Sequence, residues 1–234
     1  MQSTITIFTD GASSGNPGPG GWGAIISIDD KVVELGGGEK NTTNNRTELM
    51  AVYNALLFVV EQNKNNLPIT LYTDSSYVSN GITSWINGWR NKQWKNKAGD
   101  TIANVDIWKN LDDILSDVNL KIINVSGHSG ILGNERADQI ATSFIKDQKR
   151  YLYNGEKKDY SINLDDVSVD QDLKNTKDRK KTKAYSYVSL IGKDFKIHQT
   201  WDECKKRVQG IPGAKYRKTV SQQDEEKIKK SWGI

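Results

Sequence analysis

The sequence predicts an α/β fold with a mixed β-sheet, followed by a small second domain. Strand-like and helix-like segments alternate over residues 1–148 in the order β-β-β-α-β-α-α-β-α, which is typical of a sheet covered by helices. This regular pattern is lost from residue 149 to residue 183 and then returns in a short C-terminal stretch. Hydrophobic residues make up 35% of the 234 residues, so a core can form.

Each element of the first domain, residues 1–148, has a local sequence signature. The strands are runs of β-branched and aromatic residues that end at turn-forming residues such as Asp29-Asp30. The helices carry apolar residues at helical spacing. We expect strands at 4–9, 22–28, 31–35, 69–73 and 120–125, and helices at 47–61, 75–87, 105–115 and 134–146.

The segment 149–183 is predicted to be a flexible charged linker. It carries acidic residues from Asp159 to Asp172 and then basic residues from Lys174 to Lys183, and few apolar groups are present to offset the entropy of ordering. The doublet Lys180-Lys181 is interpreted as part of a solvated charge run rather than as a targeting signal. Residues 184–234 form a predicted small α+β domain, with strands at 185–191, 195–199 and 214–220 and helices at 202–208 and from 221.

The net charge, the cysteine count and the length of the apolar runs limit the classes of protein to which this sequence can belong. The formal charge of +4 and the pI of about 8.9 suit a polyanionic partner, although such a balance is also common on ordinary surfaces. Cys204 is the single cysteine, which excludes an intrachain disulfide and favours a reducing compartment. No apolar run reaches the roughly 18 residues of a membrane span, and the first residues lack a signal-peptide pattern. We therefore expect a cytoplasmic (intracellular) protein without a membrane partner.

Four acidic side chains lie where predicted elements can bring them together. Asp10 and Asp74 each end a strand, and Glu48 lies in the first turn of a helix whose apolar face would pack on the sheet. Asp138 lies in the last helix of the first domain. Taken singly, each has an ordinary explanation, because an Asp before Gly forms turns and a Glu in a first helical turn complements the helix dipole.

Together, these four carboxylates predict a divalent-metal site. Converging carboxylates repel one another and raise one another's pKa unless a cation neutralises them. Oxygen ligands without Cys or His clusters favour Mg²⁺ or Mn²⁺ over zinc. Two such ions about 4 Å apart can activate a water and stabilise the leaving oxygen of a phosphodiester. The residues therefore predict metal-dependent phosphodiester hydrolysis.

One of the two histidines, His128, has a sequence context that suits proton transfer. It lies in the segment VSGHSG (125–130), with glycines on both sides, just before the predicted helix of Asp138. A histidine between glycines is poorly placed for a core and well placed as a mobile proton carrier. The alternative is an exposed loop histidine without a chemical role.

The first domain resembles type 1 ribonuclease H in four segments that occur in the family's order. These are FTDGASSGNPGPGGWGA (8–24), TTNNRTELMAVYNAL (42–56), LYTDSSYV (71–78) and VSGHSGILGNERADQIA (125–141). The resemblance implies a mixed five-stranded sheet and hydrolysis of the RNA strand of RNA–DNA hybrids with two Mg²⁺ ions, for which Mn²⁺ can substitute, giving 5′-phosphate and 3′-hydroxyl ends. It makes Asp10, Glu48, Asp74 and Asp138 the metal-binding catalytic carboxylates, and His128 an aid to proton transfer or product release.

The resemblance also implies which side chains contact the hybrid. An enzyme that selects RNA must sense the 2′-hydroxyl, and amides that donate and accept hydrogen bonds suit that task. Asn16, Asn44 and Asn45 match the positions that contact the minor groove, and Asn104 matches a member of the pocket for a DNA phosphate. Thr43 and Arg46 lie nearby in sequence and are expected to touch phosphate.

Residues 85–97 interleave tryptophans with cations and resemble the basic protrusion of the bacterial-type enzymes. Indoles can pack on bases or sugars while cations hold phosphates. The alternative is that the tryptophans simply pack a helix and only the cations touch nucleic acid. The expected contact residues here are Trp85, Trp89, Lys92, Trp94 and Lys95.

Residues 185–231 resemble a hybrid-binding domain that is usually found at the N-terminus of eukaryotic-type enzymes. The segment TWDECKKRVQGIPGAKYRK (200–218) carries this resemblance. It implies that Trp201 packs on the DNA strand beside Tyr216, Arg217 and Lys218, that the hybrid is held more tightly and cut processively, and that double-stranded RNA binds more weakly. Trp201 could instead be a core residue. We expect a monomer.

Three other readings are weaker. A protein that coats hybrids without cutting them would need a degraded carboxylate set, and this chain keeps all four. A transposase or proofreading exonuclease shares strand-end carboxylates but not the TTNNRTEL and GHSGILGNERAD segments together. An ATPase of the actin and sugar-kinase type needs a much longer chain and phosphate loops.

Overall fold

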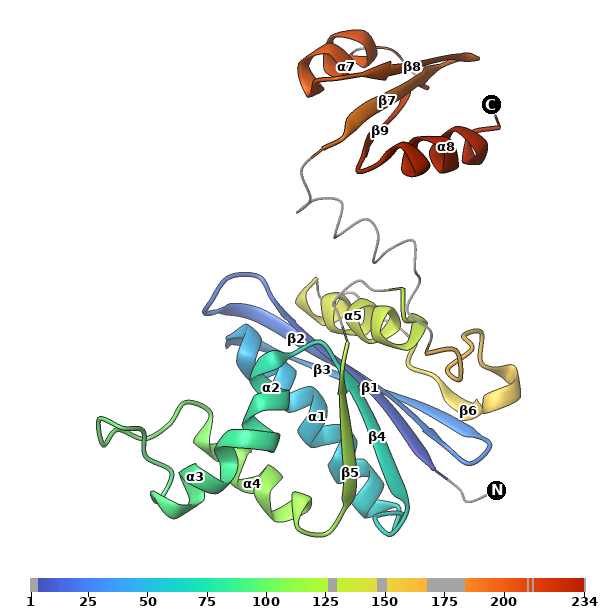
Figure 1. Cartoon of the computed structure of the whole chain (residues 1–234). Helices are drawn as coiled ribbons and strands as arrows, with labels where there is room; N and C mark the ends of the chain where they lie inside the picture. The colour runs from blue at the N-terminus through green and yellow to red at the C-terminus, as the bar shows by residue number, and fades with distance from the viewer. Residues whose placement is uncertain are drawn as a thin grey trace. The chain divides into compact units, whose positions relative to one another are not determined.

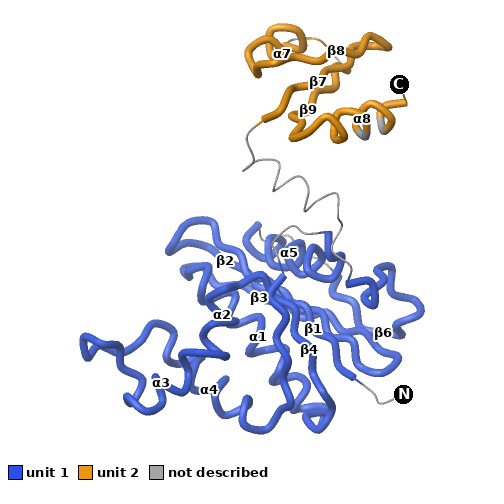
Figure 2. The backbone as a smooth tube through the Cα atoms, in the orientation of Figure 1, with its two compact units in different colours: residues 1–169 blue, residues 170–234 orange. Residues whose placement is uncertain are grey.

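In the computed structural model, the chain divides into two compact units, residues 1–169 and residues 170–234 (Figure 2). The structure describes residues 4–125, 130–146, 151–167, 184–209, 211 and 213–233. His128 and the segment 168–183 lie outside these ranges. Among the described helices, none has the length and apolar composition of a membrane span.

The first unit is built on a mixed sheet in the order β5-β4-β1-β2-β3-β6 (Figure 1). Strand β1 runs parallel to β4, and β4 runs parallel to β5, whereas β2, β3 and β6 add antiparallel pairs on the other side. The predicted mixed sheet is confirmed, but it has six strands rather than five. The strands are β1 (Ile5–Ser13), β2 (Gly18–Ile28), β3 (Lys31–Thr42), β4 (Pro68–Thr73), β5 (Asn119–Asn124) and β6 (Asn154–Glu156).

Helices cover both faces of this sheet. Because side chains alternate along a strand, Ile5 and Ile7 of β1 pack in one hydrophobic cluster and Phe8 packs in another. The first cluster includes α1 and α4, and the second includes α5. The helical segments are α1 (Asn44–Glu61), α2 (Ser76–Asn80), the π-helical turn η1 (Gly81–Trp85), α3 (Ile86–Asn91), α4 (Val105–Leu115) and α5 (Leu132–Ile145).

Part of the segment that the sequence predicted to be a linker belongs to the first unit. Strand β6 pairs with the start of β3, and a 3₁₀ turn, η2 (Lys157–Asp159), follows it. Leu164 is buried in the cluster beneath α5, and Tyr153, Tyr160 and Ile162 pack around it. These apolar residues are few and have no regular period, which is why the charged composition concealed them.

The second unit is a three-stranded antiparallel sheet in the order β8-β7-β9 with two helices. Val188, Cys204 and Ile228 lie in its interior, and the unpaired cysteine is therefore a core residue. Helix α7 begins with a capping box in which Thr200 and Glu203 bond each other's backbone N–H groups. The elements are β7 (Ser186–Ile191), β8 (Asp194–His198), α7 (Trp201–Val208), β9 (Lys215–Thr219) and α8 (Gln222–Ser231).

Candidate active site and nucleic-acid interface

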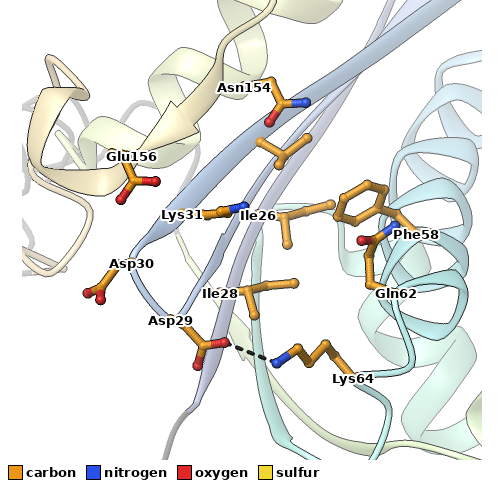
Figure 3. Close-up of a pocket in the computed structure, with 11 residues that line it drawn as sticks. Ile26, Ile28, Asp29, Asp30, Lys31, Phe58, Gln62, Lys64, Asn154 and Glu156 are labelled. Atoms are coloured by element: carbon orange, nitrogen blue, oxygen red, sulfur yellow. Dashed lines mark hydrogen bonds and ion pairs between the residues drawn. The ribbon is translucent and has the colours of Figure 1, made fainter.

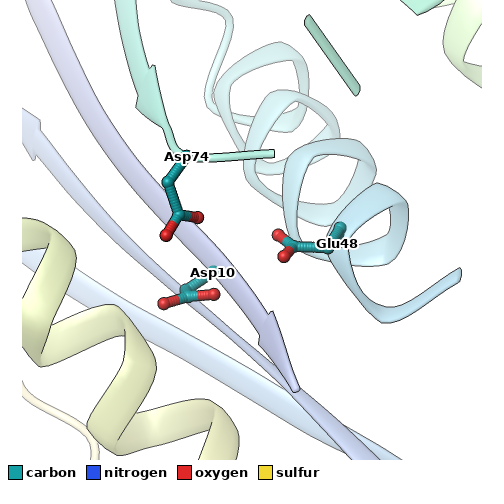
Figure 4. A group of neighbouring side chains, drawn as sticks. All are labelled: Asp10, Glu48 and Asp74. Carbon is teal, nitrogen blue, oxygen red and sulfur yellow. The ribbon is translucent and has the colours of Figure 1, made fainter. Parts of the chain in front are cut away.

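Three carboxylates of the first unit point toward one another (Figure 4). Asp10 lies in β1, Asp74 follows the end of β4, and Glu48 lies in the second turn of α1. One oxygen from each side chain lies within 4.8 Å of the others. The structure thus brings together three of the four acidic residues that the sequence analysis singled out.

The fold explains this convergence. β1 and β4 are parallel neighbours with Thr9 opposite Thr73, so Asp10 and Asp74 follow at the same end of the sheet. Helix α1 begins directly against β1, because Gly11 has no side chain and a Cβ there would overlap the backbone of Glu48. This close approach places the Glu48 carboxylate beside the strand end.

Burial and mutual repulsion disfavour the charged forms of these groups. Burial, and then the charges of Asp74 and Asp138, raise the pKa of Asp10 to about 8. The pKa of Glu48 lies well above its usual value, first because of burial and then because of the charges of Asp10 and Asp74. Asn44 donates a hydrogen bond of 3.4 Å to Glu48 Oε1, whereas the buried Oε2 has no hydrogen-bond partner among the described residues.

This donor set fits a divalent cation. It offers several carboxylate oxygens, including one buried and unpartnered, without a thiol or imidazole in the group. Asp138, on α5, is half-buried, and its charge contributes to the raised pKa of Asp10, but it is not part of the group within 4.8 Å. The predicted proton carrier, His128, lies outside the described residues.

The second unit presents a cluster of aromatic side chains. Trp201 is 39% exposed and Tyr216 is 54% exposed, and their ring centroids lie 5.5 Å apart. Tyr187 of β7 lies 5.7 Å from Trp201 and was missed by the sequence analysis, although it alternates with the buried Val188. Trp201 is therefore a partly exposed residue rather than a core residue.

Comparison with known proteins agrees with both units. A family model described as RNase H matches residues 2–146, more than half of the chain. The chain belongs to the RNase H family. A second model, described as the ribonuclease H1 N-terminal domain, matches residues 187–224, so this module follows the RNase H domain here. The predicted family and enzyme class, a ribonuclease H, are confirmed.

Relatives and solved structures support this assignment. The ribonuclease H of Bradyrhizobium diazoefficiens is 50% identical over 141 residues, which are 60% of this chain and 89% of that protein. That of Pseudomonas fluorescens is 44% identical over 151 residues, 64% of this chain and 98% of that protein. LC9-RNase H1, described as a type 1 RNase H, superimposes with a TM-score of 0.59 at 24% identity, covering 70% of this chain and 83% of its own. That likeness confirms the fold.

In this RNase H, the tryptophans of the predicted basic protrusion pack on one another. The Trp89 ring centroid lies 5.5 Å from that of Trp85 and 5.3 Å from that of Trp108, which is fully buried. Trp94 packs against the same core. Lys92 and Lys95 are exposed and Trp85 is 38% exposed, so the cations and part of Trp85 face solvent while the indoles also pack on one another.

The other predicted contact residues differ in their surroundings. Asn16 and Asn45 are exposed. Arg46 is held by two carboxylates, with N–O distances of 3.2 Å to Glu39 and 2.8 Å to Asp106. These ion pairs orient the guanidinium near the first turn of α1 and compete with a phosphate for its N–H groups.

Two further predicted contact residues, Asn104 and Thr43, form hydrogen bonds within the chain. Asn104, which is half-buried, donates to the Tyr77 hydroxyl at 3.2 Å. Thr43 caps α1 by accepting from the Arg46 N–H. In the second unit, Arg217 is exposed and Lys218 is half-buried, and both lie on the same strand as Tyr216.

A cavity of about 690 Å³ lies elsewhere, between β2, β6 and the end of α1 (Figure 3). Ile28, which lines it, pairs with Ile5, at the opposite end of β1 from Asp10. The Lys64–Asp29 ion pair of 3.2 Å is part of its wall. The carboxylate group is therefore separate from this cavity.

Proposed function

We propose that this RNase H hydrolyses the RNA strand of RNA–DNA hybrids with two bound Mg²⁺ ions, for which Mn²⁺ can substitute, and leaves 5′-phosphate and 3′-hydroxyl ends. The observation that carries the proposal is the convergence of Asp10, Glu48 and Asp74, of which Asp10 and Glu48 are buried, and which each place one carboxylate oxygen within 4.8 Å of the others. Such a group is unfavourable until a divalent cation binds.

The chain's own residues supply the frame for the reaction. Asp10, Glu48, Asp74 and Asp138 would hold the ions beside β1, where the burial of Asp10 and Glu48 keeps the local dielectric low. When bound, two such ions activate a water and stabilise the leaving oxygen of the phosphodiester. His128, which precedes α5 in the sequence, is assigned the transfer of a proton toward or away from the reacting groups.

Contacts along the first unit select the hybrid. The amides of Asn16, Asn44 and Asn45 are exposed and suit recognition of a 2′-hydroxyl. Asn44 links both tasks, since it also donates to Glu48. Phosphate contacts are assigned to Thr43, Arg46, Asn104, Lys92 and Lys95, with Trp85, Trp89 and Trp94 shaping the surface that presents the cations.

The second unit is assigned a binding role. Trp201 and Tyr216 form a partly exposed aromatic platform, with Lys218 on the same face of β9 and Arg217 on the adjacent position of that strand, a combination that suits binding of nucleic-acid strands through stacking and charge. Because both units belong to one chain, the second contact is intramolecular, with an effective concentration on the order of millimolar. The monomer thus binds hybrids tightly and cuts them processively, and it binds double-stranded RNA more weakly.

The deciding experiment is cleavage of a hybrid labelled on either strand, with Mg²⁺, by the wild type and by Asp10→Asn. The matched control is Asp29→Asn, which changes an exposed carboxylate at the opposite end of the sheet. We expect the wild type and the control to cut only the RNA strand, and Asp10→Asn to bind the hybrid without cutting it. Product ends are read by ligation and phosphatase treatment. A metal-loaded wild type that binds but never cuts would show that the chain only binds hybrids.

A further inference from the structure

Glu34 of β3 is a buried carboxylate outside both the carboxylate group and the nucleic-acid surfaces. Its side chain has no exposed area, yet both oxygens are hydrogen-bonded. Arg136 donates to it from Nε at 2.7 Å and from a terminal nitrogen at 2.8 Å. The Tyr160 hydroxyl donates at 2.7 Å, and the Tyr153 backbone N–H donates at 3.0 Å.

These partners come from two other parts of the first unit. Arg136 belongs to α5, while Tyr153 and Tyr160 belong to the segment 151–167 that follows it. Burial acts to raise the pKa of Glu34, but the hydrogen bonds from Arg136, Tyr153 and Tyr160 outweigh it and lower the pKa, so the group stays ionised. A buried and fully bonded charge pair of this kind fixes geometry rather than adding much stability.

Arg136 lies on the same helix as the fourth acidic residue, Asp138. Arg136 and Asp138 are two residues apart on a helix that turns by about 100° per residue, so their side chains point in nearly opposite directions from the helix axis. Between them, Ala137 and Ile140 form the stripe that packs on the sheet, where Gly23 has no side chain and lets the helix approach closely. Arg136 thus flanks the packed stripe on one side and Asp138 flanks it on the other.

We propose that the Glu34 anchor, made of Glu34, Arg136 and Tyr160, sets the rotation of α5 about its axis and thereby the position of the Asp138 carboxylate relative to Asp10. Glu34 and Tyr160 are positioning residues in this proposal, and they act through the helix. The inference rests on the proposed role of Asp138 as a metal ligand.

Small rotations are enough for such an effect. A side chain at the roughly 5–6 Å radius of a helix moves by about 1 Å when the helix turns by about 10°. Displacements of about 1 Å in a catalytic group can cost about 100-fold in rate. The glycine-lined contact with β2 sets the distance of α5 from the sheet, while the anchor acts off-axis and opposes rotation.

The test compares Tyr160 with Tyr153, a tyrosine of the same segment whose ring centroid lies 4.9 Å from that of Tyr160. Tyr160→Phe removes a hydroxyl that bonds Glu34, whereas Tyr153→Phe removes one that bonds the Glu156 carbonyl. Mn²⁺ binding to the full chain without nucleic acid is measured by calorimetry, and kcat and KM are measured on a hybrid. We expect Tyr160→Phe and Glu34→Gln to weaken Mn²⁺ binding by about 3- to 10-fold, at or below the usual range for groups that support metal ligands.

The same two variants should lower kcat with little change in KM, and Tyr153→Phe should match the wild type in both measurements. If Tyr160→Phe and Glu34→Gln lower only the melting temperature, the anchor is merely structural and the inference is wrong. Should Glu34→Gln fail to fold, Tyr160→Phe decides alone, because it removes a single hydroxyl.

Asp138→Asn separates this inference from the proposed function. If Asp138→Asn binds Mn²⁺ and cuts like the wild type, the assignment of Asp138 as a ligand is wrong, and the anchor has nothing to position. If Asp138→Asn is impaired while Tyr160→Phe and Glu34→Gln behave like the wild type, only the anchor is overturned.

Discussion

The carboxylate group and the aromatic surface of the second unit differ in how they affect the stability of the folded chain. Asp10 and Glu48 are buried beside Asp74, with pKa values raised by burial and repulsion, and a six-stranded sheet holds them in place. Trp201, at the start of α7, and Tyr216, on β9 of a three-stranded sheet, are partly exposed and pack on each other as uncharged rings. In the proposed function, repulsion within the carboxylate group therefore lowers the free energy of unfolding until a metal ion binds. The uncharged aromatic surface has no such effect on stability.

The largest expected effect comes from Glu48→Gln, which should separate activity from stability. Losing one preorganised charge at the reacting centre should lower kcat by about 100-fold or more. Without metal, however, the variant should melt at a higher temperature than the wild type, by about 2–4 °C for each kcal/mol of relieved repulsion. Cleavage assays and thermal unfolding in EDTA check both halves.

Glu61→Gln is the matched control, since Glu61 is exposed at the far end of the same helix. It should change neither kcat nor the metal-free melting temperature. A Glu48→Gln variant that melts lower in EDTA than the wild type would contradict the view that the group is strained without metal.

Removal of the second unit should affect capture and not chemistry. The fragment 1–169 keeps all the described residues of the first unit, and the Pseudomonas fluorescens relative consists almost wholly of the matching part. We expect KM on long hybrids to rise by about 100-fold, the lower end of the gain from linking two binding modules, with kcat unchanged. On a hybrid too short to reach both units, the fragment and the full chain should have equal KM values.

A single substitution in the aromatic surface should have a smaller effect. Trp201→Ala should weaken hybrid binding by about fivefold or more, because stacking on one aromatic side chain is worth about 1–3 kcal/mol. Trp232→Phe is the control, since Trp232 caps the C-terminal end of α8, packs against Phe195 and is not in the aromatic surface. Equilibrium binding of a labelled hybrid measures both. Equal losses in the two variants would mean that the unit had been destabilised rather than its surface altered.

Regular elements were predictable where local pattern and tertiary packing agree. Helix α4 has the predicted bounds, Val105–Leu115. Strand β3 runs on past the predicted end at Leu35 to Thr42, because Gly36 and Gly37, which suggest a break, lie in close contact with α5 and with Trp22. The single predicted helix at 75–87 is interrupted by η1, where Gly81 packs on Trp108.

Some features of the site were likewise predictable from the sequence, and others were not. Asp10 was expected to end its strand but lies inside β1, which runs on to Ser13, whereas Asp74 follows the end of the parallel neighbour β4 as expected, and the pairing of these two strands brings the residues together. The Glu34 anchor could not be predicted, because its partners Arg136 and Tyr160 lie 102 and 126 residues away in the sequence.

The last expected effect is a pH dependence of the stability of the metal-free chain, which arises from the carboxylate group and not from the aromatic surface. The folded-state pKa of Asp10 is about 8, above its ordinary value of 3.8, so the folded metal-free chain keeps a proton that the unfolded chain releases. The stability from this group is fully present below about pH 4 and is lost as the pH rises toward about 8. The melting temperature in EDTA should therefore fall steadily as the pH rises from about 5 to about 9.

Two variants show whether this slope comes from the carboxylates. Asp10→Asn removes the titrating group and should flatten the slope, whereas Trp201→Ala leaves the carboxylate group intact and should keep it. Saturating Mg²⁺ should also flatten the slope in the wild type, because the bound cation replaces the proton that offsets the repulsion among Asp10, Glu48 and Asp74. If Asp10→Asn kept the full slope in EDTA, other ionisable groups would set the pH dependence, and the contrast between the two regions would not lie in their charges.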